Sequence, residues 1–181
     1  MLSIAIMLLL AAAQTQGTTG TAGTGGAAPA GQRGAGGRGQ PPAAPGPGSP
    51  ATFKSNEELM TTLKAAIARA TNGAQASAGV ATSDQYSINV VHRSRGATPL
   101  THAGNTELHY IIEGSATVVT GGKIVRPAAG TTGTTDVEGG VSRRVVKGDV
   151  ILVPADTVHW YKDVDAAGVT YLEVRFVVPV K

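Results

Sequence analysis

The sequence predicts an all-β fold, a sandwich or a barrel, with one helix before it and a flexible N-terminal tail. From residue 86 onward, short runs rich in β-branched and aromatic residues are separated by Gly, Pro, Asn and Asp, with no helical pattern between them. Seven such runs occur, at residues 86–93, 107–113, 116–120, 141–146, 150–153, 158–162 and 169–178. Strands without covering helices bury their apolar faces by closing into a barrel or stacking as two sheets. A length of 181 residues leaves room for one such domain.

Residues 1–13 are typical of a secretory signal peptide. An apolar block that begins at Leu2 runs into the small residues Ala11, Ala12 and Ala13, and polar residues follow. We expect cleavage after Ala13 and therefore an exported protein, either periplasmic or secreted. The block is too short to span a bilayer, and no longer apolar run follows it. The sequence therefore predicts no membrane span.

Residues 14–52 form a Gly/Pro-rich linker that we expect to be disordered. Between Gly17 and Pro50 lie 12 of the 25 Gly and 6 of the 10 Pro, with no large apolar side chain to bury. Arg33 and Arg38 in this linker account for most of the net charge of +3, since the rest of the chain has 13 Lys and Arg against 12 Asp and Glu. A balance this close to neutral predicts no nucleic-acid partner.

The folded domain is expected at residues 53–181 and begins with a helix at about 56–71. Ser55 and Glu58 have the spacing of a capping box, and apolar residues follow at helical intervals, namely Leu59, Leu63 and Ile67. Asn72-Gly73 is a typical helix end, and the Ala/Gly/Ser stretch up to residue 81 is expected to be a connector. The barrel should then occupy about residues 84–179.

The segment from Gly148 to Asp163 resembles the second conserved motif of the cupin family, G-x5-P-x-G-x2-H-x3-N. Pro154 and His159 stand at their motif positions, and every interval of the motif is kept. Two letters differ, because Asp156 replaces the usual Gly and Asp163 the usual Asn. Asp tolerates the positive φ of a tight turn better than most residues. The segment therefore predicts a strand, a turn and a second strand that points His159 inward.

The segment from His102 to Gly114 resembles the first cupin motif, H-x-H, then three or four residues and E-x6-G. Glu107 and Gly114 keep the required separation, and the run Tyr-Ile-Ile-Glu-Gly carries the resemblance most firmly. One histidine is present where the motif has a pair. Its partner position falls on Gly104 or on Leu100, depending on which of the two His102 represents.

This resemblance implies a cupin-type jelly-roll β-barrel around a central cavity, and metal ligands at His102, Glu107 and His159. Two imidazoles and one carboxylate suit a single divalent ion such as Fe, Mn, Ni or Zn, and they leave coordination positions open. The chain has no Cys, so any metal must be held by His, Asp or Glu. Many single-domain cupins are homodimers, so a homodimer is also expected.

Other residues are candidates for the cavity wall. His109 follows Glu107 by two positions and so leaves the same face of a strand, where it is a candidate fourth ligand, a polar partner or a proton carrier. His92 shares a face with Val90 and is expected to point inward as a ligand, a hydrogen-bonding group or a structural residue, and Tyr110 is a further candidate for the wall. For catalysis, Glu107 and His109 are the candidate acid–base groups. In the last run, Glu173 and Arg175 have the pattern of a solvated edge strand or of a cross-strand ion pair.

The resemblance does not choose a reaction. Cupins include oxygenases, isomerases and lyases as well as proteins without catalytic activity. The sequence therefore predicts an exported cupin that binds a metal and a small polar molecule, and it leaves open whether that molecule reacts. The alternatives are a non-catalytic protein that binds a small, sugar-like ligand and a structural cupin without metal.

Overall fold

The computed structural model describes residues 43–70 and 75–177. The expected signal peptide, at residues 1–13, and most of the expected linker lie outside this range. The described end of the linker is exposed, and the Ala44 backbone N–H donates to Asp84 Oδ1 (2.9 Å). Within the described residues, none of the helical segments has both the length and the apolar character that crossing a bilayer requires.

The expected helix is present as α1, Asn56–Arg69. Its capping box is complete: the Glu58 N–H donates to Ser55 Oγ (3.2 Å), and the Ser55 N–H donates to Glu58 Oε2 (2.8 Å). Leu63 is buried against Ala78 and Val90 of the sheet. The helix ends two residues before the expected boundary at 71, where the Ala70 N–H bonds the Ile67 carbonyl.

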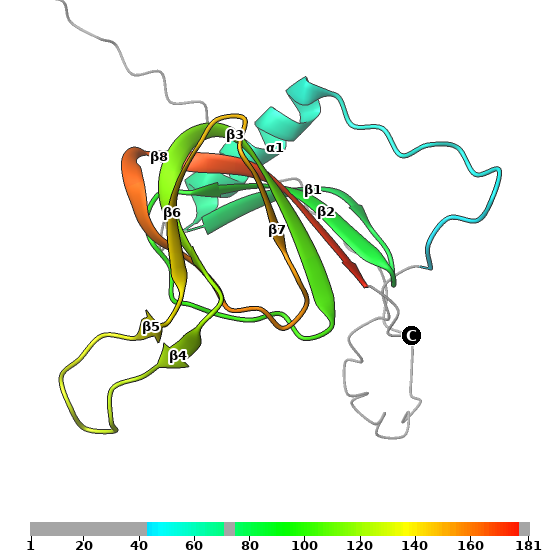
Figure 1. Cartoon of the computed structure of the whole chain (residues 1–181). Coiled ribbons are helices and arrows are strands. Elements are labelled where there is room, and N and C mark those ends of the chain that lie inside the picture. Colours follow the sequence, from blue (N-terminus) through cyan, green and yellow to red (C-terminus); the bar gives the residue numbers. More distant parts are fainter. Residues whose placement is uncertain (1–42, 71–74, 178–181) are drawn as a thin grey trace, which may run out of the picture. The chain divides into compact units, whose positions relative to one another are not determined.

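The described residues form eight strands, with a sheet order of β1-β2-β8-β3-β6 and with β7 paired to β3 (Figure 1). The strands are β1 Gln75–Thr82, β2 Tyr86–Arg93, β3 Asn105–Thr120, β4 Lys123–Val125, β5 Asp136–Glu138, β6 Val141–Val146, β7 Val150–Val153 and β8 His159–Val177. β4 and β5 form a separate hairpin, and the segment that joins them, residues 126–135, is rich in Gly and Thr.

β1 corrects the expectation of a connector before residue 81. It pairs along its length with β2, so the sheet begins at residue 75 and not at 84. Ala76 and Ala78 are buried where β1 lies under α1. Small side chains let the helix approach the strand closely, which explains why the segment has neither bulky β-formers nor a visible strand pattern.

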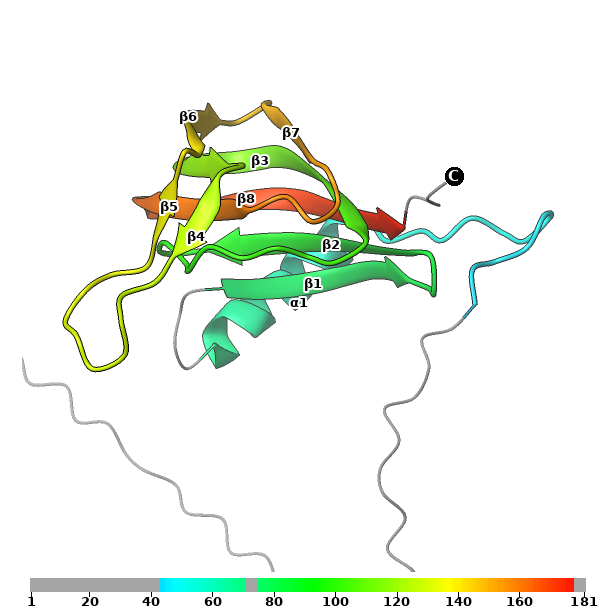
Figure 2. The ribbon, with the colours of Figure 1, turned by 60° about the horizontal axis from the view of Figure 1, so that its bottom comes forward.

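β3 and β8 are long enough to belong to both layers of the fold. Asn105–Gly114 of β3 pairs with Val169–Val177 of β8, and Ala116–Thr120 pairs with His159–Val164. The first layer continues through β2 and β1 on one side and β7 on the other, as Figure 2 shows. The second layer continues through β6, and through Ala97 and Leu100, which bond the β8 backbone. This is the expected jelly-roll arrangement, with four of the expected strands fused into two.

The apolar core lies on both faces of the first layer. On β2, Val91 points between the two layers, where it joins the main core cluster, whereas Val90 points outward beneath α1. The main cluster consists of Val91, Ile111, Ala116, Val118, Val145, Tyr161, Val169 and Tyr171. A strand covered on both faces is apolar on both, so periodicity alone does not show which face looks into the barrel.

Candidate metal centre

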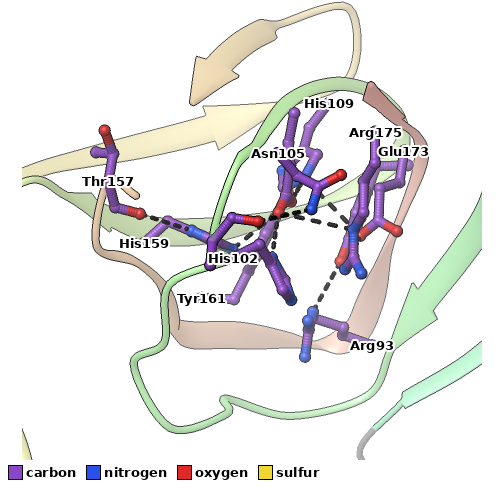
Figure 3. Close-up of polar contacts among 12 residues, drawn as sticks. Arg93, His102, Asn105, His109, Thr157, His159, Tyr161, Glu173 and Arg175 are labelled. Carbon is purple, nitrogen blue, oxygen red and sulfur yellow. Dashed lines mark hydrogen bonds and ion pairs between the residues drawn. The ribbon is translucent and has the colours of Figure 1, made fainter. Parts of the chain in front are cut away.

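Three segments that are distant in the sequence bring His102, Glu107 and His159 together. His102 lies in the loop before β3, Glu107 near the start of β3, and His159 at the start of β8. His102 Nδ1 contacts Glu107 Oε1, and His159 Nε2 lies 3.6 Å from Glu107 Oε2. One ligand atom from each residue lies within 4.8 Å of the others, so the group could hold a metal ion. Figure 3 shows the two imidazoles next to each other, carried by different segments of the chain, with ring centroids 5.2 Å apart.

A tight turn before β8 holds His159 in place. Asp156 has a φ of 61°, and the Thr157 N–H donates to the Pro154 carbonyl (3.2 Å). Asp thus adopts the conformation for which the motif usually has Gly. The Asp156 N–H also donates to the His102 carbonyl (3.3 Å). This bond ties the loop of one imidazole to the turn that positions the other.

His159 is in the form that a metal requires. Its Nδ1 donates to the Thr157 carbonyl (3.2 Å), so Nε2 is left with its lone pair towards Glu107. Burial lowers the pKa of His159, although the Glu107 carboxylate opposes this shift. The imidazole is therefore neutral at pH 7, and the backbone bond fixes its orientation as in many metal sites.

Glu107 is ionised although it is fully buried. Burial by itself raises the pKa of a carboxyl group, but the hydrogen bond from His109 and the electrostatic effects of His159, Arg175 and His102 together lower the pKa of Glu107 to about 2. An ionised carboxylate in this position supplies the negative charge that imidazole ligands do not carry.

His109 supports Glu107 from inside the barrel. Its Nε2 lies 3.0 Å from Glu107 Oε2, and its Nδ1 lies 3.2 Å from the Tyr161 hydroxyl. Burial keeps Tyr161 protonated by raising its pKa well above the usual value. The Tyr161 O–H therefore donates to Nδ1, and Nε2–H donates to Glu107. Both ring nitrogens have a partner in this structure, in which His109 orients the carboxylate.

A family model described as "Cupin" matches residues 50–174. The chain belongs to the cupin family. Among solved structures, it is similar to KdgF from Halomonas sp. (18% identity, 61% of this chain and 87% of that one, TM-score 0.44). It is also similar to TT1209 from Thermus thermophilus (18% identity, 71% of this chain and 100% of that one, TM-score 0.49). Comparison with curated proteins gives no match.

Two charged residues of this cupin lie beside Glu107, although the sequence analysis did not assign them to the site. β8 is a central strand and not an edge, and Glu173 is buried beside His109 (Oε2 to Nε2, 3.9 Å). The Arg175 Nη2 donates to Glu173 Oε2 (3.1 Å), and its Nε lies 3.6 Å from Glu107 Oε1. The pattern that could have placed them is the alternation, along β8, of Tyr171, Glu173 and Arg175 with apolar residues. We assigned the polar face to solvent, whereas the apolar face lies outside, with Leu172 packed near α1.

Glu107, His109 and Glu173 form a second cluster with the composition of a metal site. In this cluster the Arg175 guanidinium already bonds Glu173 and lies beside Glu107. The positive charge of the guanidinium already balances the carboxylates of this cluster, as a metal cation would. We therefore assign the second cluster to support of Glu107 and keep His102, Glu107 and His159 as the candidate ligands.

Two expected cavity residues lie elsewhere. His92 is on the α1 side of β2, where its Nδ1 lies 3.0 Å from Thr170 Oγ1 and where it lines a groove with Leu63 and Ile67. It does share a face with Val90, as expected, but this face looks towards the helix. Tyr110 is 42% exposed and alternates with the buried Glu107, His109 and Ile111 along β3, so it lies on the outer face.

Proposed function

We propose that this cupin binds one divalent metal ion through His102, Glu107 and His159 and acts at that site on a small polar molecule. The observation that carries the proposal is the convergence of two imidazoles and an ionised carboxylate, each oriented by hydrogen bonds from its neighbours. This donor set suits Fe, Mn, Ni or Zn and leaves coordination positions for a substrate. A bound ion would supply Lewis acidity or, with a redox metal, a place for oxygen to bind.

The chain's own groups would handle protons next to the substrate. Glu107 would be only a weak base, because its pKa of about 2 lies far below neutral pH, so its main role would be to hold the ion while Oε2 keeps its bond to His109. Tyr161, His109 and Glu107 form a continuous hydrogen-bonded chain, which keeps one proton on the Tyr161 hydroxyl and another on His109 Nε2, directed at the carboxylate. The surrounding apolar core excludes water from the inner end of this chain.

Export and dimerisation belong to the same proposal. The apolar block and the Ala run within residues 1–13 support export. A contact between two copies is supported by an apolar patch on the outer face of β3 and β7, made by Tyr110, Val150 and Leu152. Exposed apolar groups gathered in one patch, rather than scattered, are typical of interfaces.

Metal analysis tests the proposal directly. Purified wild type, incubated with each of the four metals and then desalted, should retain about one ion per chain. His102→Ala and His159→Ala should each lose more than about 100-fold in affinity, since removing an outer partner of a ligand already costs about 10- to 100-fold. His92→Gln is the matched control, because this imidazole is on the other face of the sheet and should not affect metal content.

A wild type that retains no metal would overturn the proposal. The alternative of a structural cupin without metal would then remain. If the metal is retained, the loaded protein is incubated with a panel of small acids, sugars and phenols. Mass spectrometry of the products and measurement of oxygen consumption then separate catalysis from binding alone. Binding without turnover would favour the non-catalytic alternative.

A further inference from the structure

Two side chains, one imidazole and one guanidinium, form the partly exposed side of the metal centre. His102 has 27% and Arg175 30% of its side chain exposed, whereas the Glu107 side chain between them is 1% exposed. Both approach the same atom, Glu107 Oε1, His102 by direct contact and Arg175 through Nε at 3.6 Å. Figure 3 shows that Arg175 and His102 approach from different chain segments. A molecule that reaches the centre from this side therefore meets Arg175 at the same time as the ligands.

Arg175 has hydrogen-bonding capacity left over. Its Nη2 donates to Glu173, but its Nε is buried and has no hydrogen-bond partner among the described residues. A guanidinium has five N–H donors in a planar fork that matches a carboxylate. A buried donor without a hydrogen bond costs free energy, and Glu107 Oε1, 3.6 Å away, is beyond hydrogen-bond distance, so the retention of this donor beside the ligands points to a partner that is present only when the site is filled.

Charge around the centre favours an anionic partner. Glu107 and Glu173 are balanced by Arg175 and by Arg93, whose Nε donates to the Tyr171 hydroxyl (2.9 Å). A divalent ion held by two neutral imidazoles and Glu107 would add two positive charges to this balance. A cavity with such an excess concentrates anions and disfavours cations.

We propose that Arg175 is the specificity residue of this site and binds the carboxylate of the substrate, which is thus a small organic acid. The inference rests on the proposed function, because the positive excess comes from the metal. Arg175 then does for the substrate what His109 does for Glu107: it holds a carboxylate in place beside the ion.

The test compares two probes of the same shape and different charge, lactate and lactamide, by calorimetric titration of manganese-loaded protein. Wild type should bind lactate at least 10-fold more tightly than lactamide. Arg175→Gln should weaken lactate binding by roughly 10- to 100-fold, as expected for loss of charged hydrogen bonds, and leave lactamide unchanged. Arg175→Lys should recover part of the loss. Arg143→Gln, at an exposed position on β6, is the control and should bind like the wild type.

Arg175→Gln leaves Glu173 buried without its partner, so Glu173→Gln combined with Arg175→Gln provides a neutral pair of similar size in case the single variant does not fold. The inference is overturned if the variants keep their manganese and still prefer lactate, or if loaded wild type does not discriminate between the probes. Either result leaves the proposed function intact. If the wild type retains none of the four metals, both the proposed function and this inference are overturned.

Discussion

In this cupin, hydrogen bonds and ring contacts with residues of several strands hold the buried polar side chains in place. Tyr171 illustrates this: it lies fully buried on β8, its ring stacks on Tyr161 with centroids 4.8 Å apart, and its hydroxyl accepts from Arg93 Nε. Burial raises the pKa of Tyr171 to about 12. The neutral phenol is thus part of the folded state, as the ionised carboxylate is at Glu107.

This pKa predicts a loss of stability in alkali. An unfolded tyrosine ionises near pH 10, so between about pH 10 and 12 the unfolded chain has lost the Tyr171 proton while the folded chain keeps it. The free energy of unfolding therefore falls as pH rises, by up to about 1.4 kcal/mol per pH unit from this group. Tyr171→Phe should flatten the decline by this amount in urea titrations from pH 9 to 11.5. Tyr110→Phe, which removes an exposed hydroxyl, should not, and equal slopes in all three proteins would contradict the assignment.

The site residues show which contacts a sequence can predict. His102, Glu107 and His159 were predicted because family motifs fix their spacing, and the structure brings them together. His92 was placed on the wrong side, because the β2 pattern gives the shared face but not its direction. Arg175 and Glu173 were missed for the related reason that charged residues inside a barrel have the same alternation as those in solvent.

At the level of the elements, the sharp bends of β3 and β8 determine how the layers meet. Gly114 and Gly168, both with positive φ (76° and 82°), lie against each other at this corner. A Cβ built on Gly114 would overlap the Gly168 carbonyl oxygen. The corner therefore requires glycine for its backbone conformation and for the close approach of two strands.

Gly114→Ala should therefore be among the most destabilising single changes. We expect a loss of about 2–5 kcal/mol in the free energy of unfolding, from about 1–2 for the positive φ and about 1–3 for the overlap. Gly139→Ala provides the matched control: its φ is 68°, but nothing lies within 4 Å of the added Cβ. It should lose only the conformational part. Equal losses in urea unfolding would show that the corner is less tightly packed than this geometry requires.

The elements that the sequence predicted are those whose pattern is local. α1 was predicted within two residues because its capping box and apolar spacing are contiguous. β1 was not predicted, since its strand identity comes from pairing with β2 and cover by α1, neither of which is encoded in its own small residues. Likewise, β3 and β8 were divided at the glycines that bend them.

For the whole molecule, the exposed patch on β3 and β7 carries the expectation of a dimer. Tyr110 and Val150 are direct cross-strand partners, and Leu152, 60% exposed, faces Leu108. Wild type should sediment as a dimer at micromolar concentration. Leu152→Lys, which places a charge in the patch, should shift it to a monomer, whereas Val125→Lys on the β4–β5 hairpin should not. A monomeric wild type would contradict the proposed contact.

The order of the strands also affects how the chain can assemble during synthesis. β8 follows all the other described strands in the sequence, yet it lies between β2 and β3 and bonds both. A nascent chain therefore carries two open strand edges until β8 has emerged from the ribosome, and such edges invite pairing with other chains. Because most pairings join residues far apart along the chain, closure is slow once β8 has emerged. The nascent chain that still lacks β8 is thus the form that most needs a chaperone.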